Sequence, residues 1–184
     1  LVGGISVLVF GWYNLPDNTN TFNSSRYVEG IVGAPIRPNP LFASGHTPDE
    51  DLVALIFSGL VQIGGDGTLS ADLAEEWDIT PDARTYSFRL RDDIYWHDGR
   101  RVTSSDVAFT VMRVQQIGFE GTPDLALRWM DIEVQTPDSR TIIFRLPEAR
   151  VDFLTQTALG IIPAHLLTGL GPHELLETPF HQAP

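Results

Sequence analysis

The sequence predicts an α+β fold in which helices flank a mixed, mostly antiparallel sheet. A turn stands directly before a strand pattern twice, in ITPDARTYSFRLR (79–91) and in QTPDSRTIIFRLP (135–147), as in hairpins of one antiparallel sheet. Between and after these stretches, apolar residues recur at helical spacing behind capping or proline signals. With 42% hydrophobic and 20% charged residues, the chain has a globular composition and can bury a core.

The charge balance limits the partners. Among 184 residues there are 12 Lys and Arg against 24 Asp and Glu, which gives a formal net charge of −12. Such a chain repels phosphate backbones, so we predict no nucleic-acid partner. Because the chain has no cysteine, disulfides, thiol nucleophiles and cysteine zinc ligands are excluded within these residues.

The first residues predict a membrane-associated segment followed by a linker. The apolar run LVGGISVLVFGWY (1–13) is shorter than the roughly 20 residues that span a bilayer, and it ends in Trp and Tyr, which favour the membrane interface. A polar stretch rich in Asn, Thr and Ser follows it. We therefore interpret residues 1–13 as the end of a membrane anchor or signal segment outside the core, and 14–27 as a linker. A buried strand or core helix is the alternative for 1–13.

The first elements of the domain follow the linker. A short strand is indicated at 27–35 (YVEGIVGAP), and a proline-rich loop comes after it. The next apolar pattern has helical spacing, and either Thr47 or Asp49 can cap its start. This helix is expected to end near Gly59.

A hairpin region comes next. We predict a short strand at 60–63 (LVQI), a tight turn at 64–67 (GGDG) and a short helix running into a strand at 70–80 (SADLAEEWDIT). After a turn at 81–84, the stretch TYSFRLR (85–91) alternates apolar and polar residues. Such alternation is typical of a half-buried strand, with one face made by Tyr86, Phe88 and Leu90.

The stretch YWHDGRRVTSSDVAFT (95–110) contains the adjacent acid–base residues His97 and Asp98. Neighbours on a strand point to opposite faces, so these two side chains cannot easily form a dyad. Asp98-Gly99 is a strong signal for a two-residue hairpin turn, and we predict a structural corner there. Thr103 is expected to cap the following helix with Asp106 three residues on, a capping-box pattern in which Asp replaces the usual Glu.

The second half repeats these patterns. A glycine-containing loop is expected at 116–124, and two further strands at 129–135 and 141–146. Three helices complete the chain: VDFLTQTALG (151–160), IIPAHLL (161–167) and GPHELLE (171–177). A proline starts each of the last two, as suits a first helical turn.

No residue pattern in the sequence predicts catalysis, a metal or a cofactor. The remaining histidines are His46, His165, His173 and His181, and none has the H-x-x-x-H spacing of a helical metal site. The chain has no G-x-S-x-G motif, and GGDGT lacks the Lys-Ser/Thr of a phosphate loop. Adjacent carboxylates in AEEW and RDD are typical of solvated faces.

A long ordered pattern nevertheless resembles one family. PNPLF, LIFSGLV and DGTLSADLAEEWDITPDARTYSFRLRDDIYWHDGRRVTSSDVAFT resemble the family 5 extracellular solute-binding proteins, the oligopeptide-, dipeptide- and nickel-type receptors of bacterial ABC importers. The resemblance runs from about residue 28 to the end. It is carried by Asp66, Gly67, Leu73, Ala74, Glu75, Trp77, Tyr86, Phe88, Leu90, Arg91, Trp96, Asp98, Gly99, Thr103, Asp106, Val107 and Phe109. Ala83 departs from the pattern, since a Gly is usual at that turn position.

The resemblance implies the N-terminal part of a type II periplasmic-binding-protein-like fold. Residues 28–48 correspond to the start of the first lobe and 49–184 to the subdomain inserted in it, while the second lobe is absent. It implies an extracytoplasmic binding protein rather than an enzyme, at the cell surface or in the periplasm, with ABC permease subunits as partners. The implied ligand is a peptide or another small solute, with no cofactor.

The resemblance also implies where a ligand lies. In the family, an extended segment after the NPL motif lends backbone groups to a peptide's main chain, which corresponds to Ala43, Ser44, Gly45 and His46. An aromatic ring after the Thr103 helix approaches the ligand in some members, and Phe119 is the nearest aromatic here. An ordinary surface loop is the alternative for 43–46.

Two other functions stay open at this point. A membrane-anchored sensory or chaperone-like relative has the same fold and differs in its partners. A hydrolase requires a buried His–carboxylate pair with a hydroxyl nearby, and the sequence suggests no such group of residues.

Overall fold

The computed structural model describes residues 33–43, 45–178 and 180, which belong to a unit that spans residues 31–184. The expected anchor and linker, and most of the strand expected at 27–35, lie outside the described residues. Positions 33–35 are not in a strand. Among the described residues, no helix is long and apolar enough to cross a bilayer.

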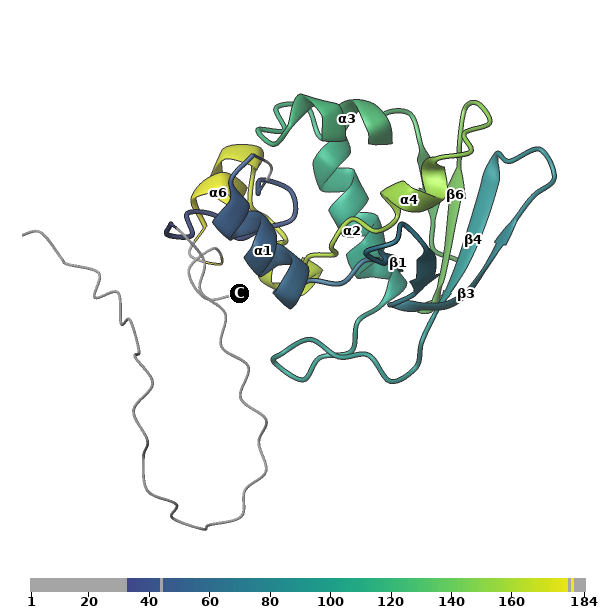
Figure 1. Cartoon of the computed structure of the whole chain (residues 1–184), viewed down its shortest axis with the longest axis horizontal. Coiled ribbons are helices and arrows are strands. Elements are labelled where there is room, and N and C mark those ends of the chain that lie inside the picture. Colours follow the sequence, from purple (N-terminus) through teal and green to yellow (C-terminus); the bar gives the residue numbers. More distant parts are fainter. Residues whose placement is uncertain (1–32, 44, 179, 181–184) are drawn as a thin grey trace, which may run out of the picture. The chain divides into compact units, whose positions relative to one another are not determined.

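A four-stranded antiparallel sheet organises the unit (Figure 1). Its order is β3-β4-β6-β5, and its strands are β3 (Ala74–Ile79), β4 (Thr85–Leu90), β5 (Glu133–Gln135) and β6 (Thr141–Arg145). A separate antiparallel pair joins β1 (Val61–Ile63) to β2 (Leu69–Ala71). The predicted α+β class and the mostly antiparallel pairing are confirmed.

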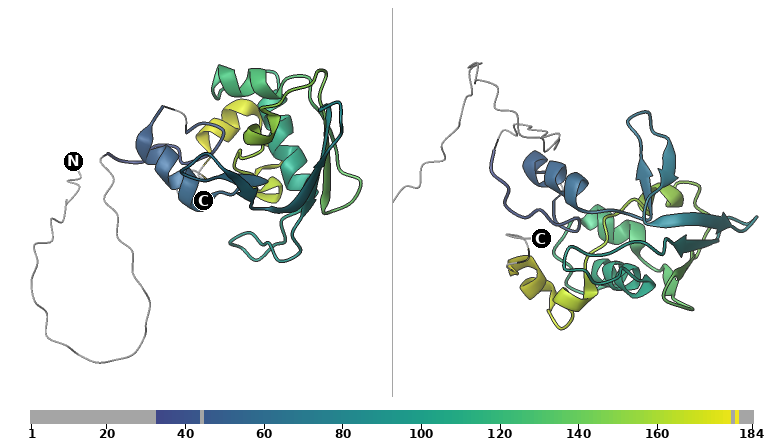
Figure 2. Two further views of the ribbon diagram at one scale, coloured as in Figure 1. Left: turned by 45° about the vertical axis from the view of Figure 1, so that its right-hand side comes forward. Right: turned by 90° about the horizontal axis from the view of Figure 1, so that it is seen from below.

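The helices lie to one side of the sheet, with α2 next to it and α1 and α6 farther away (Figures 1 and 2). They are α1 (Thr47–Ile56), α2 (Ser104–Gln115), α3 (Pro123–Trp129), α4 (Phe153–Gln156), α5 (Ala164–Leu167) and α6 (Pro172–Glu177). Helix α2 packs against β5, β6, α3 and α5. Its capping box is confirmed, since the Thr103 backbone N–H donates to Asp106 Oδ2 at 2.9 Å.

The core centres on Phe144 of β6. Its ring meets three others edge to face, with centroid distances of 5.8 Å to Phe88, 5.6 Å to Trp129 and 5.5 Å to Phe153. Tyr86, Phe88 and Leu90 point into this core from β4 and Arg89 is exposed, which confirms the predicted alternation. Aromatic pairs of this kind add to the stability that apolar burial provides.

The prediction of a short helix near residue 70 is wrong. Residues 70–80 belong instead to β2 and β3, separated by Asp72 and Leu73. The backbone between them pairs with an earlier segment: the N–H groups of Asp72 and Ala74 both donate to the Leu60 carbonyl, at 3.3 and 3.0 Å. Because this long-range pairing satisfies the backbone in extended form, it overrides the local helical pattern.

The element boundaries after α2 also differ from the prediction. Trp129 was expected to begin a strand, but it ends α3, and the strand runs only over Glu133–Gln135. Pro123 occupies the first turn of α3, a start signal that lay inside the expected loop. In the stretch 151–160, only Phe153–Gln156 is α-helical.

The predicted corner at residues 96–99, called the WHDG corner below, is a three-residue turn rather than the expected two-residue turn. The Gly99 N–H donates to the Trp96 carbonyl at 2.9 Å, and the Trp96 N–H donates to the Arg100 carbonyl at 2.7 Å. Gly99 has a φ of +84°, the left-handed conformation that closes such a turn. In the β3–β4 hairpin, which precedes this turn in the chain, Ala83 has a φ of +50° in an equivalent role.

These two turns predict substitutions of opposite effect. We expect Gly99→Ala to lower, and Ala83→Gly to raise, the free energy of unfolding by about 1 kcal/mol each, because a side chain is unfavourable in the left-handed region. Thermal melts of the two single variants test this. An unchanged melting temperature for Gly99→Ala contradicts a left-handed conformation of Gly99 in this turn.

Candidate ligand-binding site

A turn at Asn39 shapes the predicted ligand segment. The Asn39 carbonyl accepts the N–H groups of Phe42 and Ala43 at 2.9 and 3.0 Å. Its side-chain oxygen accepts the Leu41 N–H at 2.9 Å, and the residue is fully buried. Asn followed by Pro is a local signal for such a turn.

Asp49 joins this region to α1. Either Thr47 or Asp49 was expected to cap the helix, but the cap residue is His46, without a side-chain capping bond. The Asp49 carboxylate, only 3% exposed, instead accepts the N–H groups of Ile36 and Arg37 at 2.7 and 3.0 Å. It therefore holds the extended stretch that leads into the predicted segment.

The backbone donors of the described predicted residues already have partners. The Ala43 N–H bonds to Asn39, and the His46 N–H reaches the Ala43 carbonyl at 3.4 Å. The Gly45 N–H donates to Glu50 Oε1 at 2.8 Å. Because Glu50 is exposed, its side chain can turn into solvent and release this donor. Ser44 lies outside the described residues.

The side chains of this segment differ in exposure. Ala43 is buried, whereas His46 is partly exposed. His46 Nδ1 lies 3.2 Å from Asp49 Oδ2, close enough for an ion pair when the imidazole is protonated, but not aligned as a hydrogen bond. Gly45 has a φ of +83° and open space where a side chain would project.

The structure brings Phe119 to this segment. Its ring stacks on Phe42 with the centroids 5.9 Å apart and the planes at 26°. Phe42 is the last residue of the PNPLF motif, but the sequence suggested no role for it. The same holds for Gly121, over which the Phe119 ring lies. The two parts of the predicted site, separated by more than 70 residues along the chain, are therefore adjacent in space.

The WHDG corner contains a His–carboxylate pair that the sequence did not reveal. Asp98 Oδ2 lies 2.7 Å from Nε2 of His165, on α5, while its Oδ1 accepts the Arg100 N–H at 3.0 Å. The Arg100 N–H holds the pKa of Asp98 below its usual value; burial opposes this effect, and the bond to His165 adds to the lowering. The carboxylate is therefore ionised at neutral pH.

This pair does not meet the requirement for a hydrolase, which is a buried pair, because the Asp98 side chain is 39% exposed. A pocket of about 330 Å³ adjoins it, lined by Ile56, Phe57, Trp96, His97, Asp98, Pro163, His165, Leu166 and Phe180. None of these residues carries a hydroxyl or thiol that His165 could activate. The pair instead fastens α5 to the corner.

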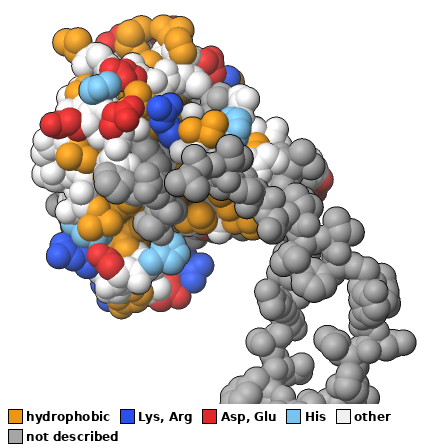
Figure 3. Space-filling model, turned by 90° about the vertical axis from the view of Figure 1, so that its left-hand side faces the viewer, with side chains coloured by type: hydrophobic (Ala, Val, Ile, Leu, Met, Phe, Trp, Pro, Cys, Tyr) orange, Lys and Arg blue, Asp and Glu red, His pale blue; other side chains and the backbone are white. Residues whose placement is uncertain are grey.

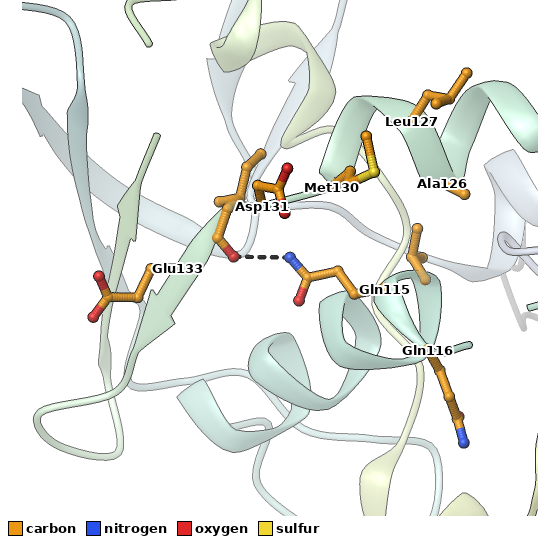
Figure 4. A pocket seen from close by; sticks show the side chains of 9 residues that line it. Gln115, Gln116, Ala126, Leu127, Met130, Asp131 and Glu133 are labelled. Carbon is orange, nitrogen blue, oxygen red and sulfur yellow. Dashed lines mark hydrogen bonds between the residues drawn. The ribbon is translucent and has the colours of Figure 1, made fainter. Parts of the chain in front are cut away.

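A second pocket, of about 500 Å³, lies between α2 and α3 (Figure 4). The Gln115 amide donates to the carbonyls of Trp129 and Ile132 at 2.7 and 2.8 Å, which ties the end of α3 to α2. Met130 and Leu127 are exposed at its rim. Its polar side chains do not converge on one point, so it lacks the arrangement of a small-molecule site.

One face of the described unit carries side chains of all kinds. On the face that carries α1 and α6, acidic, basic and apolar side chains are interspersed and no broad basic patch is visible (Figure 3). Among residues 33–43, 45–178 and 180, no group of three or more His, Cys, Asp or Glu side chains is placed to hold a metal ion.

Comparison with known proteins identifies the family. The model of the bacterial extracellular solute-binding proteins, family 5 middle region, matches residues 68–172. The dipeptide-binding protein of Escherichia coli is 30% identical over 145 residues, which cover 69% of this chain and 27% of the relative. A Brucella ovis relative is 35% identical over 105 residues, 56% of this chain and 20% of its own length.

Solved structures agree in fold. NikZ of Campylobacter jejuni, solved with Ni(L-His), superposes with a TM-score of 0.71 at 28% identity, covering 85% of this chain and 29% of that one. The oligopeptide-binding protein AppA of Bacillus subtilis, solved with a nonapeptide, gives a TM-score of 0.76 at 20% identity, covering 83% and 30%.

The chain spans less than a third of the length of each of these relatives. The expected type II periplasmic-binding-protein-like fold is confirmed for the part that it covers. The chain belongs to the bacterial extracellular solute-binding proteins of family 5.

Proposed function

We propose that this chain is part of the first lobe of an extracytoplasmic receptor that delivers a solute to an ABC importer. The observation that carries the proposal is the family match over residues 68–172. A peptide is the favoured ligand class, since the Escherichia coli relative is named a dipeptide-binding protein and the Bacillus subtilis structure holds a nonapeptide. The protein acts by binding, with ABC permease subunits as its partners.

We further propose the organisation that the resemblance implies. Residues 28–48 begin the first lobe, and 49–184 form the subdomain inserted in it. Residues 1–13 anchor the receptor to the membrane through the linker 14–27. A second lobe, outside this chain, closes the ligand pocket.

The proposed grip on the ligand combines backbone and aromatic groups. The N–H of Gly45 pairs with the main chain of an extended peptide once Glu50 turns away. The stacked rings of Phe42 and Phe119 provide an apolar surface next to it. Main-chain pairing is indifferent to side-chain identity, which suits a receptor for many peptides.

We expect the complete receptor to bind peptides in calorimetry, and the 184-residue chain to bind them little or not at all, because this chain spans less than a third of the length of its relatives. Gly45→Val in the complete receptor should weaken binding by blocking close approach of the ligand. Valine is also strained at a φ of +83°, so the matched control is Gly45→Asn, which tolerates that conformation.

A smaller loss of affinity for Gly45→Asn than for Gly45→Val points to backbone strain in the valine variant, whereas equal losses point to blocked approach. Two results contradict the proposal. One is a complete receptor that binds no peptide. The other, which concerns the site alone, is peptide binding by Gly45→Val that equals the unmodified receptor.

A further inference from the structure

Gly121 lies where the two parts of the proposed site meet. A Cβ at this position would lie 2.1 Å from Cζ of Phe119 and 2.4 Å from the Leu41 carbonyl oxygen. Both distances are far below the roughly 3.5 Å of a van der Waals contact. Only a residue without a side chain allows the ring and the carbonyl to approach this closely.

That space determines where the Phe119 ring lies. The ring folds over Gly121, two residues further along the chain, and stacks on Phe42. The Leu41 carbonyl approaches Gly121 as well, and Leu41 directly precedes Phe42. The Phe119 N–H is fixed by a 3.0 Å bond to the Gln116 carbonyl. The loop after α2 and the turn at Asn39 therefore interlock through Gly121.

We propose that Gly121 is a positioning residue for ligand selection. It sets the Phe119 ring against Phe42, and the stacked pair forms one aromatic wall at Phe42, which directly precedes Ala43. This wall favours a peptide that places an aromatic side chain against it. The inference rests on the proposed function, since it requires that a peptide lies on this segment.

A purely structural role for Gly121 gives a different result. If the glycine only allows the loop to pack, a side chain there lowers stability and weakens all peptides equally. If it positions the wall, the preference among peptides changes as well. The ratio of affinities for matched peptides therefore separates the two roles.

The test uses the complete receptor and four tripeptides: Ala-Ala-Ala, Phe-Ala-Ala, Ala-Phe-Ala and Ala-Ala-Phe. We expect the unmodified receptor to prefer one Phe-containing peptide over Ala-Ala-Ala by roughly 3- to 10-fold, the size of an aromatic contact. Gly121→Ala should reduce that ratio towards one. The matched control is Gly65→Ala, where nothing lies within 4 Å of an added Cβ, and it should keep the ratio.

Phe119→Leu removes the aromatic ring without adding bulk, so it tests the wall even if Gly121→Ala fails to fold. An unchanged ratio in Phe119→Leu, or in a folded Gly121→Ala, overturns the inference while the proposed function stands. A receptor that binds none of the four peptides removes this inference together with the proposed peptide ligand. In the 184-residue chain, loss of the Phe42–Phe119 nuclear Overhauser contacts in Gly121→Ala supports the positioning role, and their retention contradicts it.

Discussion

Replacing Phe144 by alanine is expected to lower the free energy of unfolding by about 3–5 kcal/mol. The ring is 0% exposed and lies on β6, which pairs with β4 on one side and β5 on the other. It contacts the rings of Phe88, Trp129 and Phe153. Its loss leaves a cavity that three large neighbours cannot fill without moving the sheet against the helices. Urea unfolding followed by circular dichroism measures the change.

The matched control is Arg145→Ala, one residue along the same strand. Arg145 is exposed, so we expect a change within about 0.5 kcal/mol. A loss below about 1.5 kcal/mol for Phe144→Ala contradicts a core centred on this ring, since Phe-to-Ala changes in well-packed cores cost more.

Asp106→Ala is expected to cost about 3 kcal/mol, because it removes more than a helix cap. One carboxylate oxygen accepts the Thr103 N–H at 2.9 Å, and the other accepts the Ala164 N–H at 3.0 Å. The carboxylate, 5% exposed, therefore joins the start of α2 to the start of α5. Its removal leaves two backbone donors without an acceptor. The measurement is again urea unfolding.

Asp124→Ala is the matched control, since Asp124 also lies in the first turn of a helix. Its side chain is 71% exposed and pairs with Arg128 at 2.8 Å, so a change of about 0.5 kcal/mol or less is expected. Asp106→Asn should fall between the two, because an amide can accept only through its single oxygen. Equal losses for Asp106→Ala and Asp124→Ala would show that the bond to Ala164 adds no stability.

The structure also gives a reason for the aspartate in the capping box of α2. An N-cap partner needs only one oxygen, and glutamate usually supplies it. Here the second oxygen is committed to Ala164, 58 residues away. A second bond holds the same stretch, since His165 pairs with Asp98. Asp98, before α2, and Asp106, in its first turn, therefore hold α5 against the first half of the domain.

The sequence by itself determined the features that depend on nearby residues. The capping box at Thr103, the alternation along β4 and the turn at Gly99 all rest on contacts within a few residues. Such contacts follow from side-chain chemistry at fixed spacing, so they are visible without a fold. The segment after NPL was singled out by the family resemblance alone, and its role as a ligand contact remains a prediction.

Only the tertiary structure decided the features that depend on distant residues. The stretch from Asp72 to Ala74 is extended because the Leu60 carbonyl accepts two of its N–H groups. Asp49 holds the chain before it because Ile36 and Arg37 donate to its carboxylate. Asp98 pairs with His165 rather than with His97. Phe119 stacks on Phe42 because Gly121, which has no side chain, gives the ring room. Each partner lies at least 10 residues away along the chain. The physical reason is that buried backbone N–H and carbonyl groups must form hydrogen bonds with whichever groups the fold places beside them. This requirement overrides the secondary-structure preference of the local sequence.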